Sequence, residues 1–303
     1  MTNHQAVVYW GQHGGNTREN SDLAAYCKPD SGIDIVVLAF LFTYGNGLTT
    51  PSGTIGQSCT ITSEGQAQGC DGLAAAIDHC KSRGVKVLLS LGGAVGAYSL
   101  RSQEEAEAIG QRLWDAYGNT DSKNVSRPFG KTFVDGWDFD LENSDGSQYY
   151  GHLIAKLRSN FVSDPGGRYL VTGAPQCPVP EPNMHAAIKQ AKFDYLFVQF
   201  YNNPTCSVDG HINYNEWKHY IANAPSADAK IFFGVPAAPL AATGSQSGAR
   251  YYLQPAALAS LIRAYKTDDA FGGVMLWSAA HSDGNVIGGK TYAQHVKNML
   301  GLG

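Results

Sequence analysis

V-D-G-W-D-F-D-L-E, the stretch from Val134 to Glu142, alternates apolar with acidic side chains. In a β-strand alternate side chains share a face, so Asp138, Asp140 and Glu142 point one way, while the interleaved aromatic and leucine side chains pack on the other face. Three carboxylates on one face of a buried strand repel one another, and at least one is expected to keep its proton near neutral pH. The stretch therefore predicts a buried strand that presents a proton-donating carboxylic acid.

Two other interpretations of these acids are weaker. An exposed edge strand would not need the apolar residues that fill and flank the stretch, beginning at Phe133. Hard metal ions also bind carboxylate clusters, but a strand offers a ladder of acids rather than the enclosing loop of a calcium site. We therefore predict a functional site without a metal ion or another cofactor.

Strand-like and helix-like segments alternate along the rest of the chain. Strands are predicted at residues 6–10, 33–42, 85–91, 134–142, 169–174, 195–200, 230–235 and 273–277. Helices are predicted at residues 16–27, 70–83, 102–117, 147–161, 183–190, 213–222, 255–265 and 291–300. The first helix is predicted to begin at a capping box of Asn16 and Glu19. The stretch 44–69 is rich in Gly, Ser and Thr and predicts a long loop.

This alternation indicates a parallel sheet. Eight units in 303 residues favour a single closed (β/α)8 TIM barrel over residues 1–303. An open doubly wound sheet is the alternative, but no G-x-G-x-x-G follows the first strand, which argues against the dinucleotide-binding version. No small α+β domain is evident between the seventh and eighth strands, so we expect an open, shallow cleft.

Composition narrows the class of partner. The net charge of −4 gives no basic surface for nucleic acid or an anionic membrane. No apolar run reaches the roughly 18 residues that span a bilayer. Six Cys without a C-x-x-C pair favour disulfides and an oxidising compartment, although their pairing is not decided by number alone. We expect a secreted monomer whose signal peptide has been removed, and the sequon at Asn124 fits export.

In a TIM barrel the active site lies where the strands end. The residues at these ends, beside the acids, are Tyr9, Gln12, Phe40, Asn46, Gly93, Ala94, Gln176, Gln199, Tyr201, Asn202, Met275 and Trp277. Amides and aromatic rings suit an uncharged sugar, whereas a phosphate would require Arg, Lys or a glycine-rich helix start. We therefore predict a saccharide-binding cleft.

The spacing of the acids restricts the mechanism. Glycosidases commonly place two carboxylates on opposite sides of the scissile bond, ~5–5.5 Å or ~6.5–9.5 Å apart. Acids on one strand approach the sugar from one side only. Glu142 can then protonate the leaving oxygen, and the remaining nucleophile is one that the substrate carries, such as the amide oxygen of a 2-acetamido group. Asp140 would accept the acetamido N–H, Tyr201 would hold the carbonyl, and Asp138 would share a proton with Asp140.

The same residues resemble a known family. The stretch 135–142 matches the D-G-x-D-x-D-x-E signature of glycoside hydrolase family 18, and Ser90-Leu91-Gly92-Gly93 resembles its S-x-G-G motif. Other stretches look like those of plant-type (class III, hevamine-like) chitinases, at residues 8–12, 38–40, 174–178, 199–203 and 273–278.

The resemblance implies an endo-acting chitinase that retains anomeric configuration through an oxazolinium intermediate. It implies Glu142 as general acid/base, Asp140 as the residue that orients the acetamido group, Asp138 as its support and Tyr201 as a contact to the carbonyl. Trp277 would lie under the −1 sugar. It also implies cis peptides at Ala39–Phe40 and Trp277–Ser278, and the disulfides Cys27–Cys80, Cys59–Cys70 and Cys177–Cys206.

Three alternatives share this fold. An endo-β-N-acetylglucosaminidase would act on N-glycan cores, and a lysozyme-like enzyme would act on peptidoglycan. A lectin or an enzyme inhibitor would use the barrel without catalysis, but such relatives typically lose the acid, and Glu142, Asp140 and Tyr201 are all present.

Overall fold

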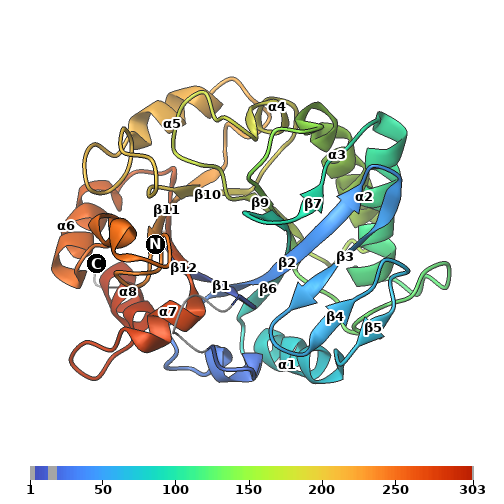
Figure 1. Cartoon of the computed structure of the whole chain (residues 1–303), viewed down its shortest axis with the longest axis horizontal. Coiled ribbons are helices and arrows are strands. Elements are labelled where there is room, and N and C mark those ends of the chain that lie inside the picture. The colour runs from blue at the N-terminus through green and yellow to red at the C-terminus, as the bar shows by residue number, and fades with distance from the viewer. Residues whose placement is uncertain (1–3, 13–18, 302–303) are drawn as a thin grey trace.

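Eight parallel strands close on themselves into a barrel in the computed structural model, which describes residues 4–12 and 19–301. Seen from the ends of the strands, the barrel strands form a ring with the helices outside it (Figure 1). Pairing of β12 with β1 completes the ring and confirms the predicted TIM barrel. The barrel strands are β1 (Gln5–Trp10), β2 (Ile35–Gly45), β6 (Lys86–Gly93), β8 (Gly136–Leu141), β9 (Leu170–Gly173), β10 (Tyr195–Gln199), β11 (Lys230–Pro236) and β12 (Phe271–Trp277).

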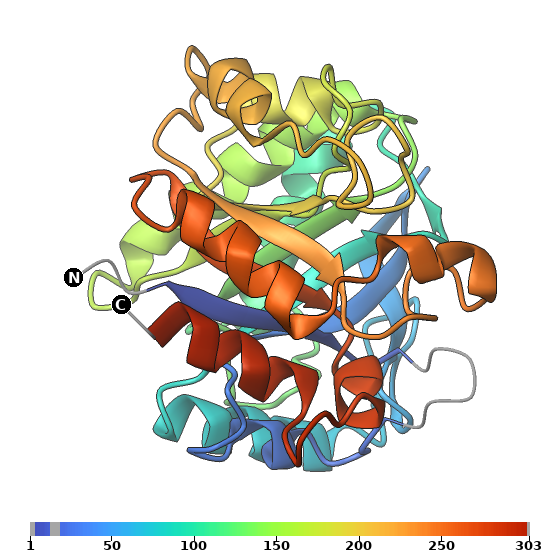
Figure 2. The ribbon, with the colours of Figure 1, turned by 90° about the vertical axis from the view of Figure 1, so that its left-hand side faces the viewer.

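Helices surround the barrel, and both ends of the described chain lie at the face opposite the strand ends (Figure 2). The helices around the barrel are the 3-10 helix η1 (Leu23–Cys27), α1 (Asp71–Ser82), α2 (Gln103–Tyr117), α3 (Tyr150–Asn160), α4 (His185–Gln190), α5 (Tyr214–Ile221), α6 (Pro255–Tyr265), α7 (Ala279–Gly284) and α8 (Tyr292–Gly301). Residues 237–270, between β11 and β12, hold only the short helix η4 (Gln246–Tyr251) and α6, so this stretch has no inserted α+β domain. Within the described residues, the helices are all too short or too polar to cross a bilayer.

Two predicted segments differ in the structure. The predicted loop 44–69 is wrong: an antiparallel extension of β2 forms there, with β3 (Leu48–Ile55), β4 (Cys59–Ile61) and β5 (Ala67–Gln68). Its Thr and Ile residues favour strands, and this preference outweighs the turn-forming Gly and Ser.

The first helix is shorter than predicted. Its described part is η1, which Asp22 caps by accepting from the Ala24 N–H. Asn16 of the expected capping box lies outside the described residues. Glu19 instead accepts from the Gly11 N–H at 2.8 Å and so joins the end of β1 to the segment before η1. The short helix α7, directly after β12, was not predicted.

The alternation in β8 separates two apolar layers. Trp137, Phe139 and Leu141 are buried in the layer between the barrel and the helices. The barrel interior has its own apolar cluster, which includes Val37 and Phe197. The acids of β8 therefore point into the barrel, as the sequence predicted.

The six Cys form the three disulfides that the family resemblance implied, Cys27–Cys80, Cys59–Cys70 and Cys177–Cys206. The last bridge joins the loops that follow β9 and β10. The peptide bonds Ala39–Phe40 and Trp277–Ser278 are cis, as the resemblance also implied.

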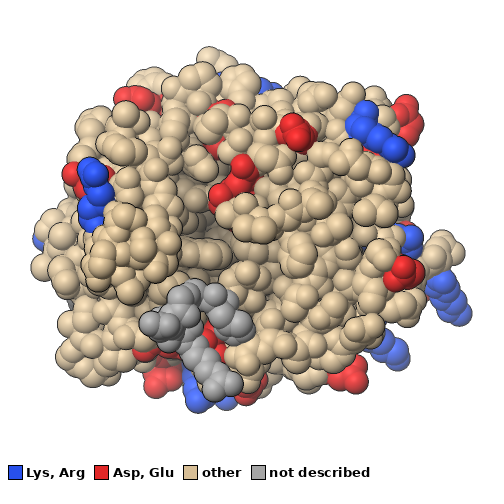
Figure 3. Space-filling model, in the orientation of Figure 1, with Lys and Arg blue, Asp and Glu red and all other residues tan. Residues whose placement is uncertain are grey.

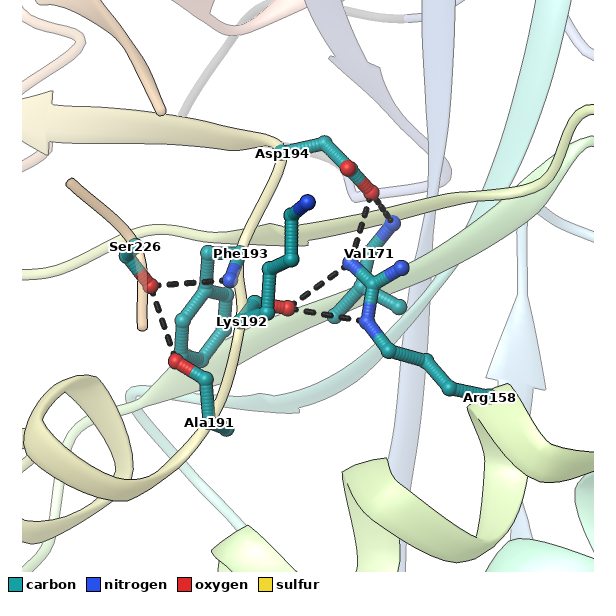
Figure 4. A network of polar contacts seen from close by, with 7 residues as sticks. All are labelled: Arg158, Val171, Ala191, Lys192, Phe193, Asp194 and Ser226. Carbon is teal, nitrogen blue, oxygen red and sulfur yellow. Dashed lines mark hydrogen bonds and ion pairs between the residues drawn. The ribbon is translucent and has the colours of Figure 1, made fainter. Parts of the chain in front are cut away.

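A polar network holds β9 and β10 together where these strands begin (Figure 4). Asp194 accepts from the buried Val171 N–H at 2.8 Å and from Arg158 of α3 at 2.8 Å. The Arg158 guanidinium also donates to the Lys192 carbonyl, and Ser226 bridges the backbone on either side of Lys192. One carboxylate thus joins two strands and a helix at the face opposite the strand ends.

The same arrangement recurs before two other barrel strands. Asp34, before β2, accepts from the Ala6 N–H at 2.8 Å and pairs with a lysine of α8. Asp135, before β8, accepts from the Val87 N–H at 2.8 Å and pairs with a lysine of α1. These contacts serve stability rather than chemistry, because TIM-barrel active sites lie at the other end of the barrel.

Replacing Asp194 by Ala should lower the free energy of unfolding by about 1–3 kcal/mol, because the buried Val171 N–H loses its acceptor. Urea unfolding followed by circular dichroism measures the change. Asp228→Ala is the matched control, since Asp228 is exposed and the structure describes no hydrogen bond for it. Equal stability of the two variants would contradict the proposed role of the network.

Candidate active site

A cleft of about 320 Å³ opens at the face where the barrel strands end. Figure 3 shows this hollow, with acidic side chains at its edge and basic side chains toward the periphery. Its walls are acids, amides, aromatic rings and small residues. They are Phe40, Ala94, Asp140, Glu142, Gln176, Gln199, Tyr201, Asn202, Asn203, Ala241, Ala242, Thr243, Gly244, Trp277 and His281.

Asp138 lies beneath the cleft and is fully buried. Its register partners on the two neighbouring strands, Ser90 and Thr172, donate hydrogen bonds of 2.7 and 2.5 Å to its carboxylate. Tyr9 donates a third at 2.8 Å from across the barrel. Burial raises the pKa of Asp138, and these three donors oppose the rise. Both oxygens therefore accept from hydroxyl groups. The proton that Asp138 is expected to share with Asp140 stays a prediction.

Asp140 and Glu142 face the cleft from the end of β8. Burial raises the pKa of Asp140 well above its ordinary value, and the charges of Glu142 and Asp138 raise it further. Burial also raises the pKa of Glu142. The charged forms of neighbouring acids repel each other in a site with little water, so a proton is retained here at higher pH than on a surface carboxyl.

Two neighbours orient these acids. The Gln199 amide donates to Asp140 at 3.1 Å and to the Ala174 carbonyl at 2.9 Å, and it opposes the rise in the pKa of Glu142. The Tyr98 hydroxyl accepts from the Glu142 N–H at 2.8 Å. The same hydroxyl donates to the Gly93 carbonyl at 2.8 Å, so the end of β8 is fastened to the end of β6.

The glycines at the end of β6 leave room for this arrangement. Gly92 has φ +110°, and a Cβ there would lie 2.1 Å from the Asp140 carbonyl oxygen. Gly93 has φ +95°, and a Cβ there would press on the ring of Phe40 at 3.0 Å. Only glycine fits both the backbone conformation and the space.

Aromatic rings form the floor of the cleft. Phe40 and Trp277 stack with ring centres 6.2 Å apart and planes 19° apart. Tyr201 is buried, and burial together with Asp140 and Glu142 raises the pKa of its hydroxyl well above the ordinary value. Tyr201 therefore keeps its proton, and no hydrogen bond is described for its hydroxyl group within residues 4–12 and 19–301.

Several predicted binding residues do not line this cleft. Tyr9 and Met275 are buried in the barrel interior, where Tyr9 holds Asp138. Gly93 lies behind Phe40, and Gln12 donates to the Ala39 carbonyl at 3.2 Å.

Asn46 is also not among the residues that line the described cleft. It forms the exposed turn between β2 and β3, and the neighbouring Gly47 N–H donates to Glu105 near the start of α2. A residue near the end of a predicted strand can therefore lie outside the cleft, because the antiparallel extension continues β2 beyond the barrel.

Other site residues were missed. Ser90 and Thr172 could have been found from strand alternation, since they lie four residues before the predicted site residues Ala94 and Gln176, respectively. The wall at 241–244, which accepts a hydrogen bond from Asn202 to the Ala242 carbonyl, comes from a loop without a local signal. His281 lies on the unpredicted α7, with Nδ1 3.0 Å from the Ser278 hydroxyl.

No cluster of three or more His, Cys, Asp or Glu side chains suited to a metal ion occurs in the described part of the chain. The cleft instead combines two carboxyl groups of raised pKa, amides and a stacked aromatic floor. These groups can bind a neutral saccharide and move a proton to or from its glycosidic oxygen. Fold and site together define the architecture of a glycoside hydrolase.

The sequence match agrees with this class. Residues 5–257 match Glycosyl hydrolases family 18. Endochitinase 2 of Metarhizium robertsii is 58% identical over 98% of this chain and 73% of that protein. The chain belongs to glycosyl hydrolase family 18.

Two solved structures with 34% sequence identity share the fold. The ICChI chitinase from Ipomoea carnea has a TM-score of 0.80, and the match covers 97% of this chain and 99% of that one. The xylanase and α-amylase inhibitor protein XAIP-II from Scadoxus multiflorus has a TM-score of 0.78 and covers 99% of each chain. One barrel thus carries an enzyme and an inhibitor, and activity has to be argued from the site.

Proposed function

We propose that this protein is an endo-acting chitinase that hydrolyses β-1,4-linked N-acetylglucosamine polymers with retention of configuration. One observation carries the mechanism: the carboxylates in the described cleft lining are Asp140, in β8, and Glu142, which directly follows this strand. The opposite walls contribute aromatic rings, amides and small residues. A pair of carboxylates on either side of the sugar is therefore missing from the described lining, and the nucleophile is the substrate's own acetamido oxygen.

In this mechanism Glu142 gives its proton to the glycosidic oxygen as the bond to the anomeric carbon breaks. The acetamido oxygen attacks that carbon and forms an oxazolinium ion. Asp140 accepts the acetamido N–H, and the protonated Tyr201 hydroxyl donates to the acetamido carbonyl oxygen. Water then attacks the anomeric carbon, gives its proton to Glu142, and regenerates the acetamido group. The raised pKa of Glu142 supports its role as the acid.

The proposal also includes the group of chitinases to which the protein belongs, the bounds of its catalytic domain and its secretion. The motifs that resemble hevamine-like chitinases, with the 58% identity to a fungal endochitinase, support a fungal member of that single-barrel group in which residues 1–303 are the catalytic domain. Trp277 forms the floor under the −1 sugar. Three disulfides and the exposed sequon residue Asn124 support secretion. We propose a monomer.

Replacing Glu142 by Gln should reduce hydrolysis of a chitin oligomer by about 10²–10⁴-fold, because Gln keeps the shape but cannot deliver the proton. Release of reducing ends measures the rate. Glu104→Gln removes the same charge at an exposed site of α2 and should leave the rate unchanged. Equal rates for Glu142→Gln and the parent protein would refute the assignment. If the protein cleaves a high-mannose glycoprotein or peptidoglycan faster than chitin, the proposed substrate is wrong and that glycan takes its place.

The acetamido group itself is tested with a changed substrate. A fully deacetylated chitosan oligomer of the same length should not be cleaved, because its free amines carry no carbonyl oxygen to attack the anomeric carbon. The measurement is the same release of reducing ends, with the acetylated oligomer as control. Brisk cleavage of the deacetylated oligomer would contradict substrate assistance.

A further inference from the structure

Glu181 is a fourth buried carboxylate near the cleft, and it has no role in the mechanism above. It lies in the segment between β9 and α4 and is 2% exposed. One carboxylate oxygen accepts from the Gln176 N–H at 3.0 Å. The other accepts from the N–H groups of Asn183, at 2.6 Å, and of Met184. Glu181 thus accepts from three backbone N–H groups. Leaving these N–H groups without an acceptor would cost more free energy in a buried site than at the surface.

These bonds connect Glu181 to the wall of the cleft. Gln176, which lines the cleft, forms a parallel bridge with Gln199 of β10. The Asn203 amide faces the Gln176 side-chain oxygen at 3.5 Å. Gln199 in turn donates to Asp140. A displacement of the Gln176 backbone would therefore be transmitted to the amide that orients Asp140.

The charge of Glu181 also reaches the acids of β8. Burial raises its pKa to about 7, against the effect of its three backbone donors, and Glu142 adds to the rise. Reciprocally, Glu181 is among the charges that raise the pKa of Asp140.

The groups that face Glu181 from the helices do not neutralise it directly. The Tyr220 hydroxyl of α5 lies 3.4 Å from the Glu181 backbone N–H. His185 and Lys189 of α4 contact Tyr220, through its hydroxyl and its carbonyl respectively. Among the described ion pairs none involves Glu181. No paired cation therefore offsets the repulsion between its negative charge and those of Asp140 and Glu142.

We propose that Glu181 is a positioning residue of the active site: it holds the Gln176 wall and places a further negative charge near Asp140 and Glu142. The inference deepens the proposed function and rests on it for the reaction. Ionisation of Glu181 makes proton loss from the other two acids harder. Glu142 then stays protonated to a higher pH than it would with only Asp138 and Asp140 as its acidic neighbours.

The variant Glu181→Gln separates this role from a merely structural one. It removes the negative charge, so the pKa values of Asp140 and Glu142 should fall, and the alkaline limb of the kcat/KM profile should move to lower pH by several tenths of a pH unit. It also replaces one of the two side-chain oxygens that accept from backbone N–H groups, so KM should rise. Glu181→Asp keeps the negative charge but has a side chain shorter by one CH₂. Its pH profile should therefore lie closer to that of the parent protein than its KM does. Glu104→Gln is the control for loss of one negative charge.

Titration of ¹³C-labelled side-chain carboxyl groups by NMR tests the inference without any substrate. In the parent protein, Asp140 and Glu142 should show an inflection at the pH where Glu181 titrates. In Glu181→Gln that inflection should vanish and both acids should titrate at lower pH. Absence of the inflection in the parent protein, or unchanged titration of both acids in a folded Glu181→Gln variant, would overturn the proposal. A parent protein that shows the inflection but leaves chitin uncut would refute the proposed function and not this inference.

Discussion

Burial of three carboxyl groups along one strand is the constraint on which the rest of the site depends. Asp138, deepest in the barrel, is accommodated because hydroxyl groups from both neighbouring strands and from Tyr9 donate to it. Asp140 and Glu142 have fewer donors, so less opposes the rise in their pKa values that burial causes. The closed barrel makes this possible, because it surrounds the strand with positions that can supply donors while the helices cover its apolar side.

Alternating residues predicted the barrel, the strand that carries the acids and the direction in which they point. This succeeded because buried parallel strands and amphipathic helices have different periods. The antiparallel extension after β2 was not predicted, because Gly, Ser and Thr there fit a loop as well as a strand. This extension places Asn46 in the turn between β2 and β3, outside the described cleft lining. The wall at 241–244 and the supporting carboxylate Glu181 come from irregular segments, whose place depends on contacts between residues far apart in the sequence.

The comparison with an inhibitor on the same barrel shows that the fold alone does not decide activity. Strand register, helices and overall shape are compatible with an enzyme and with an inhibitor. Activity therefore has to be argued from the groups that face the cleft, and here Glu142, Asp140 with the Gln199 amide that donates to it, and Tyr201 all line it. The two ends of the barrel are correspondingly distinct: Asp34, Asp135 and Asp194 join strands to helices at one end, and the acids of β8 face the cleft at the other.

The central claim is that the acids act from one side and that the sugar supplies its own nucleophile. The most direct test is the anomeric configuration of the first product, followed by ¹H NMR immediately after the protein is mixed with a chitin oligomer. Two displacements at the anomeric carbon, the first by the acetamido oxygen and the second by water, predict that the β-anomer forms first and then mutarotates. Initial release of the α-anomer would mean a single displacement by water, and it would contradict the account.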